Sequence, residues 1–302
     1  MEANGHPSPI QAAQPSGRAH REHWVPRGRY QLYTREYPGQ EPTVVLMHGF
    51  PDDLHLYDRL VPELAGRRLV TFDFLGWGAS DKPTGYPYTA SNQTGDLDAV
   101  LEHLQLGSVV LVAHDASGPP AINWALDHPQ RVAALVLLNT YYSRMPGLRP
   151  PEAIRAFSTP VVRSVARPIS RLFGGLPFRR LYRWQVGRFF RDPEVREQFL
   201  PLLYQQFAAS PSAHEAFFSL NRDLLPTVAA GTATVPRLHH FGRPVRVVFG
   251  AADPYLNIRV ARRFHELFPT SELFLLDGAR HYVQLDEPHQ VAQLILTTPP
   301  SG

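Results

Sequence analysis

The chain has 302 residues, 43% of them apolar, and a formal net charge of +3 at pH 7. That length fits one large domain or two small ones, and the apolar content is enough for a substantial core. The absence of cysteine excludes a disulfide scaffold and suits a reducing, cytoplasmic location. We expect neither a membrane span nor a signal peptide, because no long apolar run and no apolar N-terminal segment occurs.

The first part of the chain predicts a tail followed by a mostly parallel sheet. Residues 1–23 are rich in proline, glycine, serine, glutamine and alanine without periodicity, which is typical of a disordered tail. Residues 27–37 alternate between polar and apolar, as in an edge hairpin. From residue 43 to residue 140, apolar strands alternate with helical segments, including one at 91–104 capped by Ser91, and this alternation favours an α/β fold.

A sharp turn joins a buried strand at residues 109–113 to a helix at residues 119–127. The turn is His114-Asp115-Ala116-Ser117-Gly118, and the residues that flank its apex are small. Such an elbow places the apical side chain over the carboxyl edge of a sheet. A carboxylate there would attack carbon and form an ester if that carbon carried an epoxide oxygen or a halide. Helix capping is the alternative role for Asp115.

Two later residues occur in the chain order that such a nucleophile requires. A strand at 245–250 ends in a turn that presents Asp253, and a strand at 272–276 ends in a loop that presents His281. Open α/β sheets bind ligands beyond these strand ends, so we predict that Asp115, Asp253 and His281 meet. The alternatives are an ordinary turn residue for Asp253 and an ordinary loop residue for His281.

Two backbone N–H groups complete the predicted centre. The strand at 43–47 leads into His48-Gly49-Phe50-Pro51, and the N–H groups of Phe50 and Ala116 would form an oxyanion hole. The Gly76-Trp77-Gly78 segment lacks the third glycine of a dinucleotide site, so we interpret it as a turn. His239-His240 and most of the other histidines lie in no ligand spacing, and we therefore expect neither a metal nor a cofactor.

The middle of the chain predicts a helical insertion. No convincing strand occurs in residues 141–238, whereas 152–173 and 178–230 resemble helices interrupted by prolines. This divides the chain into a first core part at 24–140, a helical cap at 141–238 and a second core part at 239–297. Residues 141–200 hold twelve arginines and four acidic residues, which indicates either a solvated face or attraction to an anionic substrate or membrane surface. No nucleic-acid recognition motif occurs.

The chain resembles α/β-hydrolases of the epoxide hydrolase and haloalkane dehalogenase group. The resemblance spans most of residues 25–297 and rests on HGFPDD (48–53), DFLGWGASDKP (73–83), AHDASG (113–118), GAADP (250–254) and GARHYVQLDEP (278–288). It implies an α/β-hydrolase fold with a cap domain that closes over an aspartate nucleophile. It also implies two steps, in which Asp115 forms an alkyl ester and His281, oriented by Asp253, activates the water that cleaves it.

The residues that stabilise the leaving group in this family are absent from their usual positions. Haloalkane dehalogenases carry tryptophan after the nucleophile and fluoroacetate dehalogenases carry arginine, but here the residue is Ala116. Many dehalogenases also have asparagine where this chain has Phe50. Epoxide hydrolases use two cap tyrosines, and rough alignment places Val186 and Asn221 there. Other tyrosines could substitute or could simply pack in the core: Tyr141, Tyr142, Tyr182 and Tyr204.

The sequence therefore favours an epoxide hydrolase that acts on a small molecule. A haloalkane or haloacid dehalogenase, an atypical member whose reaction ends without net hydrolysis, and a non-enzymatic ligand-binding relative stay open. The sequence does not indicate the oligomeric state. For the substrate pocket we predict Trp77, Tyr141, Tyr182, Trp184, Tyr204 and Asn221, with Phe50, Phe157 and Phe217 as further lining residues.

Overall fold

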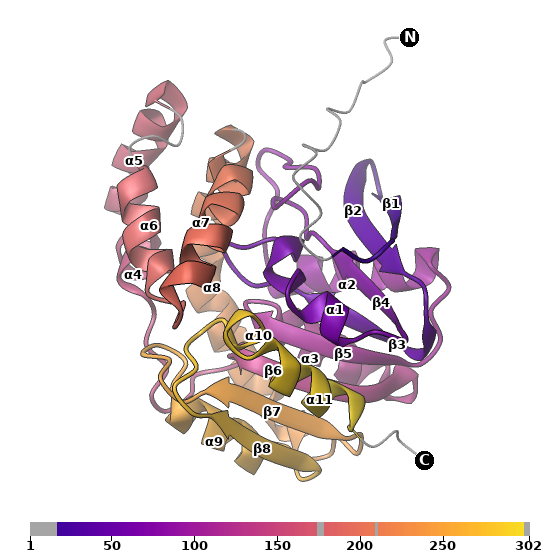
Figure 1. The fold of residues 1–302 in the computed structure, drawn as a ribbon. Helices are drawn as coiled ribbons and strands as arrows, with labels where there is room; N and C mark the ends of the chain where they lie inside the picture. Colours follow the sequence, from indigo (N-terminus) through magenta and orange to yellow (C-terminus); the bar gives the residue numbers. More distant parts are fainter. Residues whose placement is uncertain (1–16, 174–177, 209–210, 299–302) are drawn as a thin grey trace.

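The computed structural model describes residues 17–173, 178–208 and 211–298. At its centre lies an eight-stranded sheet with the order β1-β2-β4-β3-β5-β6-β7-β8 (Figure 1). The strands are β1 (Arg21–Arg27), β2 (Tyr30–Tyr37), β3 (Gln40–Met47), β4 (Arg67–Phe72), β5 (Val109–Asp115), β6 (Val132–Thr140), β7 (Val245–Gly250) and β8 (Ser271–Leu276). Only the pairings of β1 with β2 and of β2 with β4 are antiparallel, so the mostly parallel sheet is confirmed.

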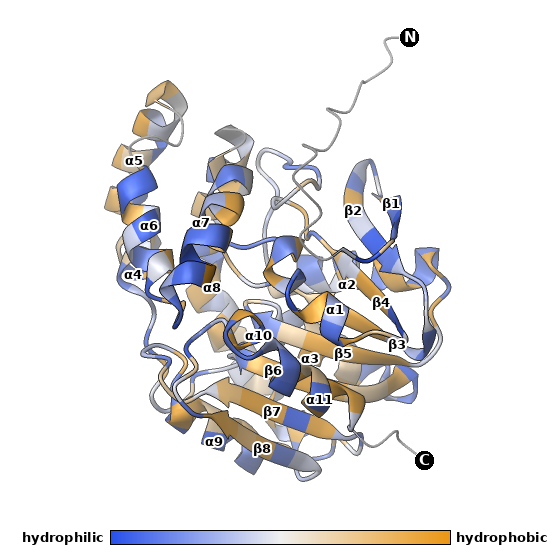
Figure 2. Cartoon of the chain, viewed as in Figure 1, coloured by the Kyte–Doolittle hydropathy of each residue, from blue (hydrophilic) through white to orange (hydrophobic). Residues whose placement is uncertain are grey.

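The central strands are almost continuously apolar because helices cover both faces of the sheet. Every residue of β6 is buried, and residues 109–114 of β5 are buried too. Figure 2 shows the apolar colour concentrated on these strands and mixed colours on the outer helices. Because the strands are parallel, the segments that follow β3, β5, β6, β7 and β8 all leave the sheet at the same edge.

The N-terminal edge differs from the sequence-based prediction. Residues 1–16 lie outside the described part, but the predicted tail ends before residue 23, because β1 begins at Arg21. Arg18 fixes the preceding segment by donating to the carbonyl oxygens of Pro38 and Arg67, each at 2.7 Å. The hairpin is accordingly longer than predicted, and it turns at Gly28, whose φ of +63° suits glycine.

Helices flank the sheet on both faces. Figure 1 shows α1 (Leu60–Glu63), α10 (Val283–Asp286) and α11 (Pro288–Leu296) in front, with α2 (Ala90–His103), α3 (Gly118–Asp127) and α9 (Ile258–Leu267) behind. The short 3₁₀ helices η1 (Leu54–Tyr57) and η2 (Pro129–Arg131) complete the core. Helix α2 starts one residue earlier than predicted, because Thr89 rather than Ser91 accepts the capping bond, from the N–H of Asn92.

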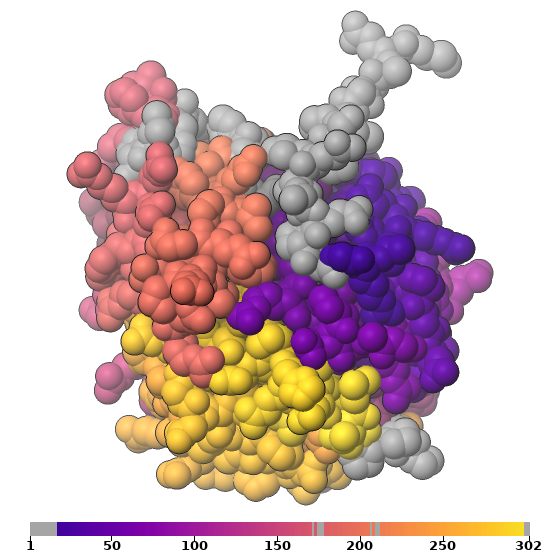
Figure 3. Space-filling model, viewed as in Figure 1, coloured from indigo at the N-terminus to yellow at the C-terminus, as the bar shows by residue number. Residues whose placement is uncertain are grey.

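Five helices form the cap region, and no strand occurs among its described residues. They are α4 (Glu152–Ser158), α5 (Pro160–Phe173), α6 (Arg179–Gly187), α7 (Pro193–Ala208) and α8 (Pro211–Leu238). The predicted helical stretch 178–230 is interrupted between α6 and α7, and α8 continues to Leu238 although it contains Pro226 and Pro236. Figure 3 shows the cap in salmon resting against the C-terminal segment in yellow. Within the described residues, no helix combines the length and apolarity needed to cross a bilayer.

Candidate active site

Asp115 sits at the apex of the turn between β5 and α3. Its φ of +48° is unusual for a residue with a side chain, and the tightness of the elbow explains it. The Ser117 hydroxyl accepts from the N–H of His114 at 2.8 Å and lies 2.8 Å from the Met47 carbonyl oxygen, which pins the turn to β3. Gly118 is required because a Cβ there would lie 2.0 Å from the Thr140 hydroxyl oxygen.

The structure brings Asp115, Asp253 and His281 together from the ends of β5, β7 and β8. His281 Nδ1 lies 2.7 Å from Asp253 Oδ2, and His281 Nε2 lies 3.9 Å from Asp115 Oδ1. Asp253 also accepts hydrogen bonds from the N–H groups of Tyr255 and Leu256. His281 and Asp253 are buried, whereas 15% of the Asp115 side chain is exposed. The histidine is thus oriented by one carboxylate and faces the other.

The pKa values of Asp115, Asp253 and His281 depend on burial and on the charges of one another. Burial alone would lower the pKa of His281, but Asp253 and, to a lesser extent, Asp115 and Asp52 raise it to about 9. Burial alone would raise the pKa of Asp253, but His281 and the hydrogen bonds hold it below its ordinary value. For Asp115, burial raises the pKa more than His281 and the neighbouring N–H groups lower it. At neutral pH the centre accordingly contains an imidazolium between two carboxyl groups.

The loop after β3 supplies the N–H donor predicted for an oxyanion hole. The N–H of Phe50 donates to Asp115 Oδ2 at 3.0 Å, and the N–H of Ala116 also binds this carboxylate. The neighbouring Gly49 allows the approach, because a Cβ there would lie 2.5 Å from Asp115 Cβ. His48 holds the loop: Nε2 accepts from the N–H of Phe74 at 3.1 Å, so Nδ1 is left to donate to the Gly49 carbonyl at 2.8 Å.

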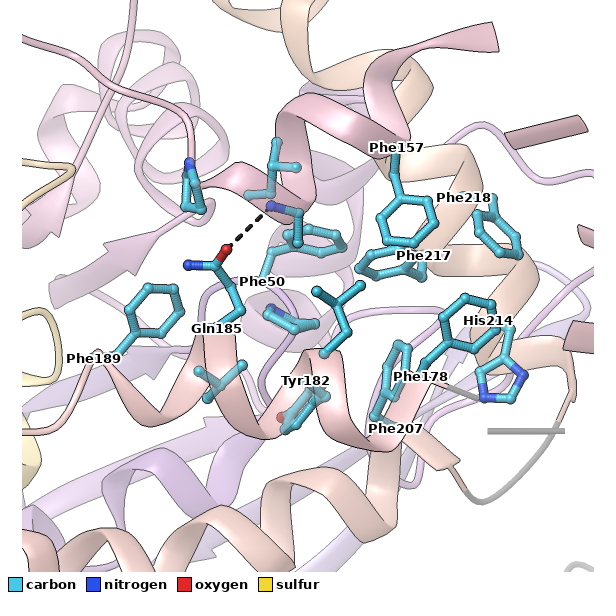
Figure 4. A pocket seen from close by; sticks show the side chains of 16 residues that line it. Phe50, Phe157, Phe178, Tyr182, Gln185, Phe189, Phe207, His214, Phe217 and Phe218 are labelled. Carbon is cyan, nitrogen blue, oxygen red and sulfur yellow. Dashed lines mark hydrogen bonds between the residues drawn. The ribbon is translucent and has the colours of Figure 1, made fainter. Parts of the chain in front are cut away.

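Two adjoining cavities lie between this centre and the cap. The first, called the reactive cavity, comprises about 650 Å³ of space that is partly open to solvent, and its lining includes Asp115, Ala116 and His281 together with Tyr141, Arg149 and Tyr255. The second, called the aromatic chamber, comprises about 590 Å³ of space that is also partly open to solvent. Figure 4 shows Phe157, Phe178, Phe207, Phe217 and Phe218 gathered at one end of the chamber, with Phe189 and Gln185 at the other. Both cavities share walls at Phe50, Pro151, Ile154 and Phe189.

The predicted pocket residues fall into two groups. Tyr141 lines the reactive cavity, Tyr182, Phe157 and Phe217 line the aromatic chamber, and Phe50 lines both. The other four predicted pocket residues line neither cavity: Trp77, Trp184, Tyr204 and Asn221.

Each of these four has another packing role. Trp77 packs edge-on behind Phe50, and Tyr204 packs against Tyr182. Trp184 faces outward, is 49% exposed and lies under the guanidinium of Arg188. The amide of Asn221 donates to the carbonyl of Phe217 within α8.

Several residues that position the site were missed in the sequence. Asn139 donates to Asp253 Oδ2 at 2.8 Å and accepts from the N–H of Gly250 at 2.8 Å. The Tyr255 hydroxyl donates to Glu152 at 2.7 Å and accepts from Gln185 at 2.9 Å. Asn139 had a detectable signal, because it is a polar residue near the end of an otherwise apolar strand. Tyr255 had none, since its partners are more than 60 residues away.

The fold and the assembled side chains define an α/β-type hydrolase with a helical cap. A family model described as the alpha/beta hydrolase fold matches residues 42–288, and the chain belongs to that family. LipZ of Mycobacterium tuberculosis, named as a hydrolase, is 28% identical over 287 residues, which cover 91% of this chain and 94% of LipZ.

Two further comparisons agree with this family. A cis-3-alkyl-4-alkyloxetan-2-one decarboxylase of Xanthomonas campestris pv. campestris is 28% identical over 281 residues, 86% of this chain and 88% of the relative. The crystal structure of haloalkane dehalogenase DatA from Agrobacterium tumefaciens matches with a TM-score of 0.79 at 24% identity, and covers 94% of this chain and 97% of DatA. At that identity the structural likeness concerns the fold alone.

Proposed function

We propose that this hydrolase opens a strained oxygen-containing ring, most simply an epoxide, by nucleophilic attack of Asp115 on carbon. The observation that supports this is the carboxylate at the elbow, held by the N–H of Phe50 and facing a histidine that Asp253 orients. A carboxylate needs no base for this attack, because it is already ionised. Attack forms a bond from Asp115 Oδ to carbon, breaks the carbon–oxygen bond of the ring and leaves an alkyl ester.

The second step would be hydrolysis of that ester by water. In the resting centre His281 carries a proton because two carboxylates face it. Esterification removes the charge of Asp115, which lowers the pKa of His281 and lets the imidazole act as a base after it loses its proton. Water would then attack the ester carbonyl, and the N–H groups of Phe50 and Ala116 would stabilise the resulting oxyanion.

The surroundings of Asp115 favour an oxygen leaving group and an apolar substrate. Ala116 and Phe50 offer no side-chain donor to a departing halide, and Trp184 faces away from both cavities. The walls shared by the reactive cavity and the aromatic chamber are apolar or aromatic, which suits alkyl or aryl substituents on the ring. We therefore place an alkyl- or aryl-substituted epoxide first.

A β-lactone is the second candidate substrate. One relative is named as a decarboxylase of an oxetan-2-one that carries two alkyl groups, and the two adjoining apolar cavities would accept two such groups. Attack of Asp115 on the saturated ring carbon that is bonded to the ring oxygen would break that carbon–oxygen bond and release the ring carbonyl group as a carboxylate. Loss of carbon dioxide could then form an alkene as the Asp115 ester departs, so this reaction would consume no water.

A single-turnover experiment in water enriched in heavy oxygen separates these reactions. Excess enzyme is mixed with styrene oxide, with 1-bromohexane or with cis-3-hexyl-4-hexyloxetan-2-one, and both product and protein are examined by mass spectrometry. Epoxide hydrolysis through an ester places the heavy oxygen in Asp115 and not in the first diol. An alkene marks the lactone reaction, and free bromide marks dehalogenation. Label in the first diol, or unchanged turnover by Asp115→Asn, would overturn the proposal.

A further inference from the structure

We infer that Tyr141 donates the proton to the oxygen that leaves the ring, so that the core supplies the acid that the cap lacks. This inference rests on the proposed function. It assigns a catalytic donor where Val186 and Asn221 occupy the usual positions of the cap tyrosines. It also accounts for how an oxygen leaving group could depart from a cavity with mostly apolar walls.

The backbone fixes Tyr141 beside the nucleophile. In the register of β5 and β6, Asp115 is the partner of Thr140, and Tyr141 follows directly. The Thr140 hydroxyl donates to the Asp115 carbonyl. The Tyr141 carbonyl oxygen packs so closely against Gly118 that a Cβ on residue 118 would lie only 2.7 Å from it. Tyr141 lines the same cavity as Asp115 and His281. Its position is therefore set by the elbow itself and not by the cap.

Among the described tyrosines of the reactive cavity, Tyr141 is the one whose hydroxyl group is free to bind a substrate. Among the described residues, Tyr141 and Tyr255 are the tyrosines that line the reactive cavity, and the Tyr255 hydroxyl is engaged by Glu152 and Gln185. Within the described part of the chain the Tyr141 hydroxyl makes no hydrogen bond. Tyr142 donates to Asn123, and Tyr182 lines only the aromatic chamber.

The acidity of the Tyr141 hydroxyl increases during the reaction, which favours proton donation. Burial and then the charge of Asp115 raise the pKa of Tyr141 well above 10, so the phenol keeps its proton in the resting centre. Esterification of Asp115 removes the opposing charge and makes the phenol a stronger acid as the alkoxide forms. The alkoxide takes the phenolic proton, and the phenolate regains one from the His281 imidazolium, which becomes the neutral base for the second step.

His281 is the competing donor, and the rate of ester formation separates the two. In a His281→Gln background the ester on Asp115 should accumulate, so its formation from styrene oxide can be followed by rapid quench and intact-protein mass spectrometry. Adding Tyr141→Phe should slow this step about 100-fold, the range for a positioned general acid. The matched control is Tyr142→Phe, which removes a neighbouring hydroxyl that faces Asn123.

Each outcome has a definite meaning. An ester that forms equally fast with Tyr141→Phe overturns the role of Tyr141 but leaves the proposed function intact. Absence of any ester in the His281→Gln background, together with no ester in the wild-type enzyme, overturns both.

A second inference rests on the outer face of α5. We propose that this face binds the surface of a bilayer that contains anionic lipid. Val161, Val165, Ile169, Leu172 and Phe173 form one stripe on the helix and are between 39% and 75% exposed. The opposite face is anchored, because Ala166 and Ser170 are buried and the Arg163 guanidinium donates to the carbonyls of Phe157 and Ser158. The stripe is therefore a fixed surface feature.

Charge decides between a bilayer and a second copy of the chain. Exposed arginines without an ion pair among the described residues lie on two other helices of the cap: Arg155 on α4, which packs against α5, and Arg179 and Arg180 on α6, which packs against α4. Two copies joined through this face would bring these cations together, whereas anionic headgroups would neutralise them. The arrangement, an apolar stripe with arginines near it, matches a helix that lies in a membrane interface. The aromatic chamber beneath shares Phe157 and Phe178 with this part of the cap.

Vesicle flotation of the full chain tests this surface. With phosphatidylcholine containing a quarter phosphatidylglycerol, the protein should float at about 0.1 M salt and lose most binding at 0.5 M salt or with phosphatidylcholine alone. The double variant Val165→Glu, Leu172→Glu should abolish flotation. The control is Leu275→Glu, an exposed apolar residue on β8.

Two results would overturn the membrane assignment. Equal flotation of the double variant and the wild type would show that the stripe is not the binding surface. A concentration-dependent dimer that becomes a monomer in the double variant, measured by light scattering without vesicles, would assign the stripe to self-association. A wild-type protein that stays in the lower fraction with anionic vesicles would likewise exclude this partner.

Discussion

At the scale of single residues, Asn139 links the acid of the centre to the neighbouring strand. Its amide donates to Asp253 and accepts from the N–H of Gly250. Asn139→Ala should slow cleavage of the Asp115 ester about tenfold, because Asp253 loses a donor that favours its charged form and holds its orientation. Burst kinetics would separate this step from ester formation, which should be unchanged. A variant in which only ester formation is slowed would contradict this role of Asn139.

The raised pKa of His281 predicts how stability depends on pH. A histidine whose pKa is about 9 in the folded protein and 6.5 in the unfolded chain stabilises the fold fully below pH 6.5 and loses this contribution as the pH rises through 9. The total change is of the order of 3 kcal/mol. Urea unfolding of wild type and His281→Gln between pH 6 and 10 measures it. The difference in free energy of unfolding should shrink with rising pH, and a constant difference would refute the assignment.

At the scale of helices and strands, the sequence predicted the ends of strands better than the walls of the cavity. The positions of Asp115, Asp253 and His281 follow from local rules, because each comes shortly after an apolar parallel strand. The cap residues do not follow such rules. Trp184 and Tyr182 both lie on α6, two residues apart, and the helical turn places one outward and the other in the aromatic chamber. Which face of a cap helix is inward depends on its neighbours.

The loop after β3 and the elbow after β5 act as one unit, and Gly49 joins them. A Cβ at residue 49 would lie 2.5 Å from Asp115 Cβ, so Gly49→Ala should displace the Asp115 side chain or the Phe50 N–H. We expect ester formation to fall at least about 100-fold, as misplacement by roughly 1 Å can do. Gly107→Ala is the control, since a Cβ there meets nothing within 4 Å. Equal rates for the two variants would show that this contact is unimportant.

At the scale of the whole molecule, cap and core are joined by polar contacts around the site. The Arg191 side chain of the cap pairs with Glu287, and the N–H of Arg191 donates to Asp286 of α10 at 3.0 Å. The N–H of Tyr282, the residue after His281, donates to the Phe189 carbonyl at 3.3 Å. Figure 3 shows this contact region between the salmon and yellow segments. The segment that follows His281 therefore also binds the cap.

Tyr255 connects the cap to Asp253, the carboxylate that orients His281. Its N–H donates to Asp253, while its hydroxyl bridges Glu152 on α4 and Gln185 on α6. Tyr255→Phe leaves the buried amide of Gln185 without this acceptor, which costs about 1–3 kcal/mol locally. The destabilisation should be confined to the cap, because the hydrogen bond from the N–H of Tyr255 to Asp253 does not involve the hydroxyl.

Hydrogen exchange distinguishes this local effect from general destabilisation. Amides of α4 and α6 should exchange about tenfold faster in Tyr255→Phe, while those of β5 and β6 keep their protection. The KM for an apolar epoxide should rise more than kcat falls, since the cap provides the aromatic chamber and not the nucleophile. Tyr30→Phe, which removes a hydroxyl bonded to exposed Arg29, is the control. Uniformly faster exchange across the sheet would mean that the bridge supports the whole fold rather than closure of the cap over the reacting centre.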